Sequence, residues 1–179
     1  YHPVTLENNT VEEQFLNLLK VLDRNPKIRM IFTKANADTN GRIVNELIDK
    51  YAAQNSERAC AFMSLGQKRY LSALKYCRIV IGNSSSGIIE APSFGKPIIN
   101  RGDRQKGRIC ADSVINCGYT QQEIQQAMET ALTKEFENKA SNCRNPYEKE
   151  NTAANIISVI KDYLLNDKIK LKKGFYDIK

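Results

Sequence analysis

The chain has 179 residues, of which 41% are hydrophobic and 26% are charged, and its formal net charge is +7. This composition is typical of one globular domain of ordinary size and excludes a largely disordered chain. The sequence has no apolar run long enough to span a bilayer and no charged-then-apolar leader. Because the first residue is Tyr1 rather than Met, we expect a piece of a longer protein, cut on its amino-terminal side.

The cysteines argue against two kinds of cross-link. The five cysteines are widely scattered, no two are spaced CxxC, and only one histidine is present. We therefore expect neither a disulfide framework nor a structural zinc site, and we predict a cytoplasmic protein in a reducing environment. The cysteines are Cys60, Cys77, Cys110, Cys117 and Cys143.

The positive charge is compatible with nucleic acid, anionic lipid or a phosphorylated small molecule as a partner. Part of the excess lies in a basic tail, residues 166–179, which we interpret as a solvated terminus. The chain lacks Trp, and no stretch alternates basic and aromatic residues as a base-stacking surface would. The sequence therefore favours a small anionic ligand, with no nucleic-acid or membrane partner.

Helical and strand-like segments alternate along the chain. A capping box at Thr10 opens a first helix that Pro26 ends, and capping boxes at Ser64 and Thr120 open two more. Strands are predicted at 28–32, 59–62, 78–81, 98–99 and 113–116, and the other helices around 44–51, 87–94 and 151–165. Residues 134–150 are predicted to be irregular. In the last helix an apolar face is expected to point inward, formed by Ile156, Ile157, Ile160 and Leu164.

This alternation predicts an α/β fold: a single parallel sheet with helices on both faces, Rossmann-like, over residues 1–165. In such sheets ligands bind outside the carboxyl ends of the strands. The loops that follow predicted strands are therefore the places to look for a site. They are residues 33–41, 63–66, 82–87 and 100–108.

The loop from Gly82 to Gly87, with the sequence Gly-Asn-Ser-Ser-Ser-Gly, follows the clearest strand and opens a helix. Backbone N–H groups in that position, together with serine hydroxyls, can bind a phosphate. The alternative is a serine-rich helix cap with no ligand. The loop lacks the lysine of a P-loop and is not a GxGxxG motif, so spacing alone leaves both interpretations open.

A second loop concentrates basic residues at the same expected edge of the sheet. The guanidinium fork of arginine matches the geometry of phosphate oxygens. We therefore predict anion binding here, against the alternative of an ordinary solvated surface. The residues are Arg101, Arg104, Lys106 and Arg108.

Other polar residues have two interpretations each. Glu90 either stabilises the helix that the serine loop opens or accepts hydrogen bonds from two ribose hydroxyls. The only histidine, His2, is either structural or part of a site. For Asn36 and Asp38 an ordinary turn is favoured over a ligand contact.

Three motifs occur together in a fixed order: His2-Pro3-Val4-Thr5, the run from Gly82 to Glu90, and the run from Gly102 to Arg108. Together they resemble the hydrolysing UDP-N-acetylglucosamine 2-epimerases of sialic acid biosynthesis, over nearly the whole of residues 1–165. The resemblance implies the carboxyl-terminal, UDP-binding half of a two-domain GT-B-type enzyme. Most acid/base carboxylates of the family would lie in the missing amino-terminal domain.

The resemblance also implies roles for particular residues. Ser84, Ser85 and Ser86 would bind the diphosphate together with Arg104. The remaining roles are a ribose contact by Glu90, uracil binding near Leu65 and Tyr70, and a catalytic contact with the sugar by His2.

The implied reaction converts UDP-N-acetylglucosamine and water into N-acetylmannosamine and UDP, by elimination to a glycal and rehydration. It implies no cofactor and no metal, and a homo-oligomeric full-length enzyme. The alternatives on the same architecture are a non-hydrolysing epimerase, a relative acting on a diacetamido UDP-sugar, and a nucleotide-sugar glycosyltransferase. The alternative from another class is a non-catalytic nucleic-acid-binding module.

Overall fold

The computed structural model describes residues 10–36, 41–166 and 168–169. The chain divides into two compact units, Tyr1–Pro146 and Tyr147–Lys179. This division differs from the expected single domain over residues 1–165, because the last helix belongs to the second unit.

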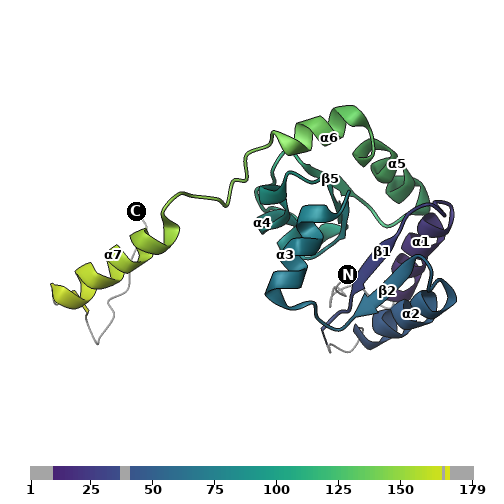
Figure 1. Ribbon diagram of the computed structural model, residues 1–179, viewed down its shortest axis with the longest axis horizontal. Helices are drawn as coiled ribbons and strands as arrows, with labels where there is room; N and C mark the ends of the chain where they lie inside the picture. Colours follow the sequence, from purple (N-terminus) through teal and green to yellow (C-terminus); the bar gives the residue numbers. More distant parts are fainter. Residues whose placement is uncertain (1–9, 37–40, 167, 170–179) are drawn as a thin grey trace. The chain divides into compact units, whose positions relative to one another are not determined.

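The strands of the first unit are all parallel, as predicted (Figure 1). Strand β1 (Met30–Thr33) pairs with β2 (Ala59–Phe62), with Met30 opposite Ala59. Strand β4 (Ile98–Arg101) lies between β3 (Val80–Gly82) and β5 (Val114–Cys117). The described strands therefore form a two-stranded and a three-stranded sheet, and the expectation of a single sheet was wrong. Alternating elements predict parallel strands, but which strands pair depends on where each crossover returns the chain.

Helices pack against both faces of the three-stranded sheet. The bounds in the first unit are α1 Val11–Asp23, α2 Gly41–Gln54, α3 Gly66–Tyr76, α4 Ser86–Ile89, α5 Gln121–Ala131 and α6 Lys134–Ser141, with short 3-10 helices η1 Ala91–Phe94 and η2 Asp103–Gln105. Ile98 and Ile99 of β4 are both buried but belong to different hydrophobic clusters, since successive side chains of a strand point to opposite faces. The prediction of helices on both faces is confirmed.

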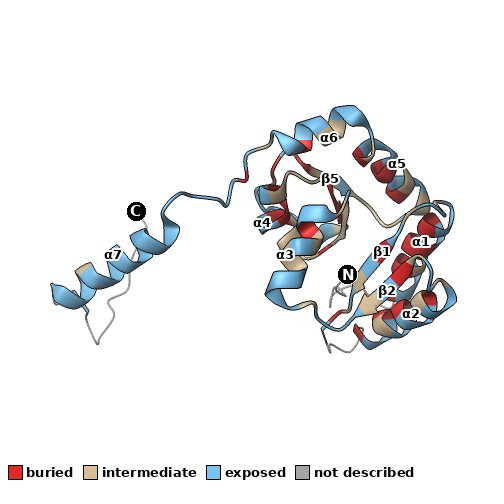
Figure 2. Ribbon diagram, in the orientation of Figure 1, coloured by how far each residue is buried: buried red, intermediate tan, exposed pale blue. Residues whose placement is uncertain are grey.

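The larger hydrophobic cluster joins the two sheets. Phe15, Leu18 and Leu22 of α1 are buried at the spacing that the sequence predicts (Figure 2). They share this cluster with Met30 of β1 and Ile99 of β4, and α1 packs against both α2 and α5. The first unit therefore has one main core, although its strands form two sheets.

Of the three predicted capping boxes, one forms. Thr120 accepts a hydrogen bond from the Glu123 backbone N–H, and Glu123 accepts one from the Thr120 backbone N–H. Thr10 instead has a helical backbone, and its hydroxyl accepts from the side-chain amide of Gln14. Helix α3 begins after Leu65, so Ser64 is not its cap residue. The hydroxyl of Ser64 accepts only a hydrogen bond from the Gly66 N–H among the described residues. The motif is necessary but not sufficient, because the cap residue must also have an extended backbone.

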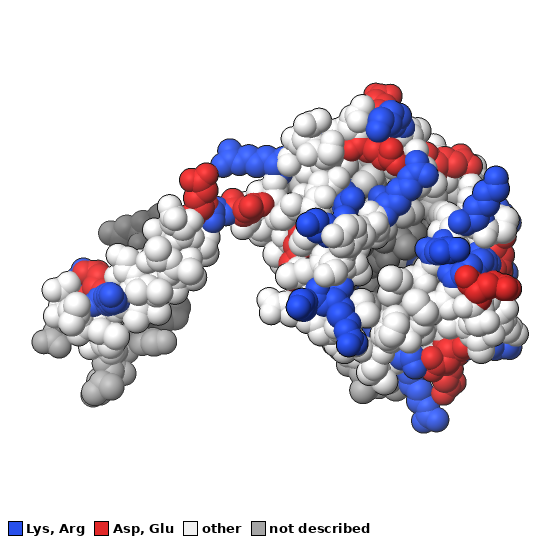
Figure 3. Space-filling view, viewed as in Figure 1, with Lys and Arg blue, Asp and Glu red and all other residues white. Residues whose placement is uncertain are grey.

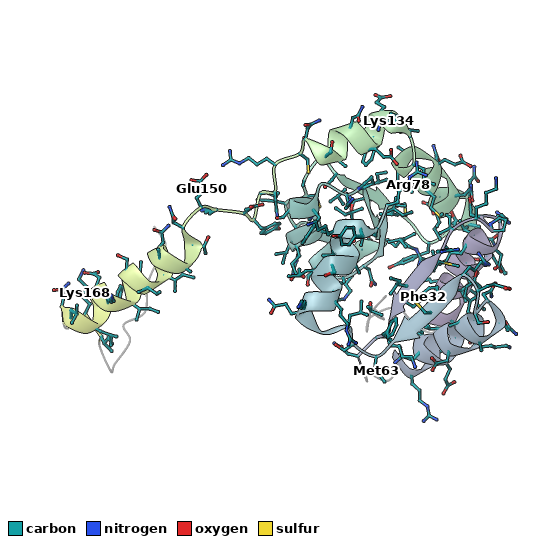
Figure 4. The ribbon with its side chains drawn as sticks, viewed as in Figure 1. Phe32, Met63, Arg78, Lys134, Glu150 and Lys168 are labelled. Carbon is teal, nitrogen blue, oxygen red and sulfur yellow. The ribbon has the colours of Figure 1, made fainter. Side chains whose placement is uncertain are left out.

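Helix α6 lies in the stretch that was expected to be irregular. The Thr133 hydroxyl caps it by accepting from the Phe136 N–H at 3.2 Å, and Glu135 lies in its first turn. Arg78, which is labelled in Figure 4, lies just before β3 and donates to the Glu137 carboxylate of this helix at 2.6 Å. The polar composition of this stretch led to the prediction of irregular structure, whereas α6 is stabilised by a cap and a tertiary contact.

The second unit contains helix α7 (Thr152–Leu165), which has no buried residue. The apolar face that the sequence predicts is present along one side of the helix, but its side chains are exposed rather than turned into a core: Ile156, Ile157, Ile160 and Leu164. Helical periodicity identifies the apolar face of a helix and says nothing about what covers it. No helix in the described residues is long and apolar enough to cross a membrane.

Candidate functional site

The serine loop leaves strand β3 at Gly82 and enters α4 at Ser86. Asn83 is fully buried, whereas Ser84 and Ser85 are partly exposed. The serine hydroxyls do not cap the helix: the only contact of this kind is a long 3.4 Å bond from the Ser86 N–H to Ser84 Oγ. No acceptor for the backbone N–H groups of Ser84 and Ser85 lies within the described part of the chain. The loop therefore presents amide and hydroxyl donors, as a phosphate-binding loop does.

Helix α4 is only four residues long and is followed by the 3-10 helix η1. The sequence predicted one helix to about Phe94, with a dipole that would favour a phosphate. A single turn aligns few peptide dipoles, so the loop's own N–H groups contribute more than the macrodipole.

The serine loop is joined to the basic loop through one carbonyl oxygen. Asn83 O accepts a hydrogen bond from Arg104 Nη1 at 3.0 Å and another from Gln105 Nε2 at 2.8 Å. Arg104 is otherwise exposed. The structure thus brings together the two loops that the sequence assigned to one anion.

A glycine makes the turn that presents Arg104. Gly102 has a φ of +71°, and a Cβ built on it would lie 1.9 Å from the hydroxyl oxygen of Tyr119. Any other residue would be strained there and would collide with the tyrosine ring. The turn into η2, and with it the position of Arg104, therefore requires glycine.

The four cations of the basic loop do not act together. Arg101 is fully buried, and its Nη2 donates to the carbonyl of Gln14 in α1 at 2.8 Å. Its guanidinium also lies 5.9 Å from the centre of the Tyr119 ring. The expectation that Arg101 belongs to the anion-binding set was wrong, because the strand end turns its side chain into the protein. Lys106 pairs with Asp103 at 3.6 Å, and Arg108 is exposed.

Tyr70 of α3 contacts the first residue of α4. Its hydroxyl is hydrogen-bonded to Ser86 Oγ. Burial raises the pKa of Tyr70 above its ordinary value of 10.0, the bond to Ser86 opposes that rise, and the nearby Glu90 carboxylate adds to it. Tyr70 is therefore a neutral hydroxyl at physiological pH, and it ties α3 to the serine loop.

The remaining predicted residues have the following positions. Glu90 is exposed at the end of α4, near Tyr70. Leu65 is half-buried at the start of α3, and no recorded hydrogen bond or core contact links it to the serine loop among the described residues. Asn36 is exposed after β1, whereas His2 and Asp38 lie outside the described residues.

Sequence reasoning missed Asn83 and Gln105 as parts of this site. Both are buried polar residues inside the two motifs, at 0% and 3% exposure. A polar residue that is buried in a loop between charged neighbours usually makes a specific hydrogen bond, but burial cannot be read from the sequence. No group of three or more potential metal ligands occurs among residues 10–36, 41–166 and 168–169.

On the face of the first unit in Figure 3, basic side chains are scattered among acidic and neutral ones.

An α/β unit whose post-strand loops combine serines, unused N–H groups and an arginine is typical of proteins that bind phosphorylated ligands, nucleotides in particular. The family model for UDP-N-acetylglucosamine 2-epimerase matches residues 1–161, and the chain belongs to this family.

Two relatives show how far the similarity extends. The chain is 45% identical over 136 residues to a hydrolysing GDP/UDP-N,N'-diacetylbacillosamine 2-epimerase of Campylobacter jejuni, covering 76% of this chain and 35% of that protein. It is 35% identical over 179 residues to the polysialic acid biosynthesis protein P7 of Escherichia coli, covering 99% of this chain and 45% of that protein. The chain therefore spans between about a third and a half of these relatives.

Solved structures confirm the fold. A structure of S. aureus MnaA with UDP matches with a TM-score of 0.70 at 19% identity, over 97% of this chain and 46% of that one. An epimerase from Neisseria meningitidis bound to UDP-GlcNAc matches with a TM-score of 0.62 at 19% identity, over 83% of this chain and 40% of that one. The predictions of the family and of a GT-B-type α/β architecture with parallel strands are confirmed.

Proposed function

We propose that this chain is the UDP-binding domain of a hydrolysing 2-epimerase that acts on a UDP-linked 2-acetamido sugar. The family model, described as UDP-N-acetylglucosamine 2-epimerase, supports UDP-N-acetylglucosamine as the substrate, with N-acetylmannosamine and UDP as products, in sialic acid biosynthesis. The relative named for polysialic acid biosynthesis supports that pathway. The proposal includes a second domain outside this chain, a homo-oligomeric full-length enzyme and a cytoplasmic location, and it requires no cofactor.

One observation carries the proposal. The carbonyl of Asn83 holds Arg104 directly beside the serine loop. We assign the diphosphate to Ser84, Ser85, Ser86 and Arg104, the ribose to Glu90, the uracil to the region of Leu65 and Tyr70, and the sugar to His2.

This arrangement suits a reaction in which a diphosphate leaves. In the first step a base removes the proton on C2, the C1–O bond breaks, and its electron pair leaves with UDP, which produces a glycal. In the second step water adds its oxygen to C1 and a proton returns to C2 on the opposite face. Negative charge grows on the diphosphate during the first step, so donors fixed beforehand around it stabilise the transition state more than the substrate.

A second candidate substrate is supported by the relative at 45% identity, which is named for a nucleotide-linked N,N'-diacetylbacillosamine. This sugar carries a second acetamido group but has the same diphosphate. The groups that we assign to the diphosphate suit both substrates equally. The choice depends on contacts with the sugar.

The test has two stages. In the first, the 179-residue chain is titrated with UDP, uridine and an oligonucleotide by calorimetry; we expect UDP to bind more tightly than uridine. Preference for the oligonucleotide would identify a nucleic-acid-binding module instead. In the second, the full-length protein is incubated with each UDP-sugar in turn. Free sugar together with UDP indicates hydrolysis, whereas a UDP-linked epimer without free UDP indicates a non-hydrolysing enzyme.

A further inference from the structure

Gln105 is the most deeply buried polar side chain of the basic loop after Arg101, and the proposed function gives it no contact with the ligand. It is 3% exposed, and its Nε2 donates to the Asn83 carbonyl at 2.8 Å, across 22 residues of sequence. Its other polar atom, Oε1, is buried and has no hydrogen-bond partner among the described residues. One donated bond is therefore the only polar contact recorded for this buried amide.

The Asn83 carbonyl is saturated by two donors from adjacent residues of η2. A carbonyl oxygen has two lone pairs, and Gln105 Nε2 and Arg104 Nη1 fill them. The two donors differ, because Gln105 is held in the interior whereas Arg104 is exposed. An exposed arginine loses side-chain entropy when it is fixed, so the buried glutamine is the permanent partner of this oxygen.

Fixing this carbonyl fixes the peptide group that begins the serine loop. The peptide between Asn83 and Ser84 is planar and trans, so the Ser84 N–H points away from the oxygen that Gln105 holds. Two hydrogen bonds on the carbonyl also polarise the amide and make its N–H a stronger donor. Gln105 therefore acts on the direction and the strength of a donor that it does not touch.

We infer that Gln105 is a positioning residue that holds the serine loop, and with it the Ser84 N–H, in the conformation that binds the diphosphate. The identity of the ligand rests on the proposed function. The effect of Gln105 on the conformation of the serine loop does not. Gln105 contacts no substrate itself. Arg104 remains free to turn its other N–H groups toward the ligand while Gln105 keeps the loop in place.

The test compares two buried amides. Gln105→Met keeps a side chain of similar length and removes the donor. The matched control is Asn145→Leu, which removes a buried amide that donates to the carbonyl of Ile89 at 2.8 Å, at the other end of α4, and to Ser93 Oγ at 2.7 Å. We expect Gln105→Met to weaken UDP binding by about 3- to 10-fold and uridine binding by less than 2-fold, as the loss of one hydrogen bond predicts. Asn145→Leu should change neither. Equal UDP affinity in the wild type and Gln105→Met would overturn the inference.

Amide hydrogen exchange provides a readout that needs no ligand. In the serine loop, the Gly87 N–H donates to Ser84 O at 3.1 Å; in η1, the Ser93 N–H donates to Glu90 O at 3.2 Å. Gln105→Met should accelerate exchange at Gly87 more than at Ser93, and Asn145→Leu should do the reverse. If UDP does not bind the wild type, the proposed function fails for this chain while this comparison still decides the role of Gln105. Unchanged exchange at Gly87 would overturn that role.

A measurement on the unmodified chain covers the case in which Gln105→Met does not fold. The side-chain amide protons of Gln105 should exchange with solvent much more slowly than those of the exposed Gln67. Equal exchange rates would show that Gln105 does not hold the carbonyl, and the inference would be wrong.

Discussion

At the scale of single residues, the site depends on how each side chain divides its hydrogen bonds between the protein and a ligand. Arg101 and Arg104 are three residues apart and chemically identical, yet Arg101 is buried against α1 while Arg104 uses one nitrogen on Asn83 O and exposes the others. Only Arg104 lies at the surface, where an anion can approach it.

Arg104→Ala is expected to weaken UDP binding far more than uridine binding. The lost contact is charge-assisted and costs about 1.5–3 kcal/mol, or about 10- to 150-fold in affinity. Arg104→Lys should restore only part of the affinity, because an ammonium cannot bond Asn83 O and a phosphate with the same planar fork. Calorimetry with the two ligands is the measurement, and equal losses for both would place Arg104 away from the diphosphate.

A substitution at Glu90 is expected to affect binding of the nucleoside part of UDP and not binding of its diphosphate. If its carboxylate accepts from both ribose hydroxyls, Glu90→Gln should weaken UDP binding and have much less effect on 2′,3′-dideoxy-UDP. Ser84→Ala and Ser85→Ala should weaken both ligands alike, each by about 0.5–1.5 kcal/mol. The coupling energy between the protein change and the ligand change is the quantity to measure. A value near zero for Glu90→Gln would mean that Glu90 makes no contact with the ribose hydroxyls.

Tyr51 predicts a pH dependence of stability. Its hydroxyl donates to Asp23 at 2.8 Å and accepts from Arg58 at 2.7 Å. Burial, followed by the bond to Asp23, raises the pKa of Tyr51 from 10.0 to about 12. A raised folded-state pKa stabilises the protein below pH 10, and this contribution disappears as the pH rises from 10 through about 12. Urea unfolding over that range should show a steeper loss of stability in the wild type than in Tyr51→Phe; parallel curves would contradict the prediction.

At the scale of elements, similar local motifs have different tertiary outcomes. Thr10 and Thr120 both begin a capping-box sequence, but only Thr120 has the extended backbone that aims its hydroxyl at the third N–H of the helix. Helix α6, in contrast, forms on a sequence without a strong apolar repeat, because Thr133 caps it and Arg78 binds its Glu137.

The two threonines provide a matched pair for measuring a helix cap. Thr120→Ala is expected to lower the free energy of unfolding by about 0.5–2 kcal/mol, because the N–H of Glu123 loses its acceptor. Thr10→Ala should cost less, since it removes only a partly buried bond from the Gln14 side chain. Urea denaturation of both variants is the measurement, and equal losses would mean that the cap at Thr120 contributes no more stability than the Gln14 bond at Thr10.

At the scale of the whole molecule, the first unit carries its own core. Every buried hydrophobic residue that the structure describes lies between Val11 and Ala140. The two hydrophobic clusters cover opposite faces of β4, so this part of the chain buries both faces of that strand.

We expect the 179-residue chain to unfold in one cooperative transition and to release no N-acetylmannosamine from UDP-N-acetylglucosamine. The core of the first unit supports folding, whereas we propose that most acid/base groups lie in a domain outside this chain. Thermal denaturation followed by circular dichroism tests the first part, and sugar release tests the second. A featureless melt would mean that the core needs another domain, and release of free sugar by this chain would overturn the assignment of the catalytic groups.

The class of fold, the family and the two loops of the candidate site are visible in the amino-acid sequence. Alternating strands and amphipathic helices are local patterns, and the motifs around Ser84 and Arg104 are contiguous, so both are visible before folding. The cap at Thr120 belongs with them, because all its atoms come from four consecutive residues.

The pairing of the strands, the inward turn of Arg101 and the meeting of Gln105 and Arg104 on one oxygen are evident only in the folded structure. Each of these depends on segments that are distant in sequence: Gln105 lies 22 residues from Asn83, and Arg101 lies 87 residues from Gln14. Hydrogen bonds over such distances are set by how the layers pack against one another. That packing is a property of the folded chain, whereas propensity, periodicity and capping are properties of its segments.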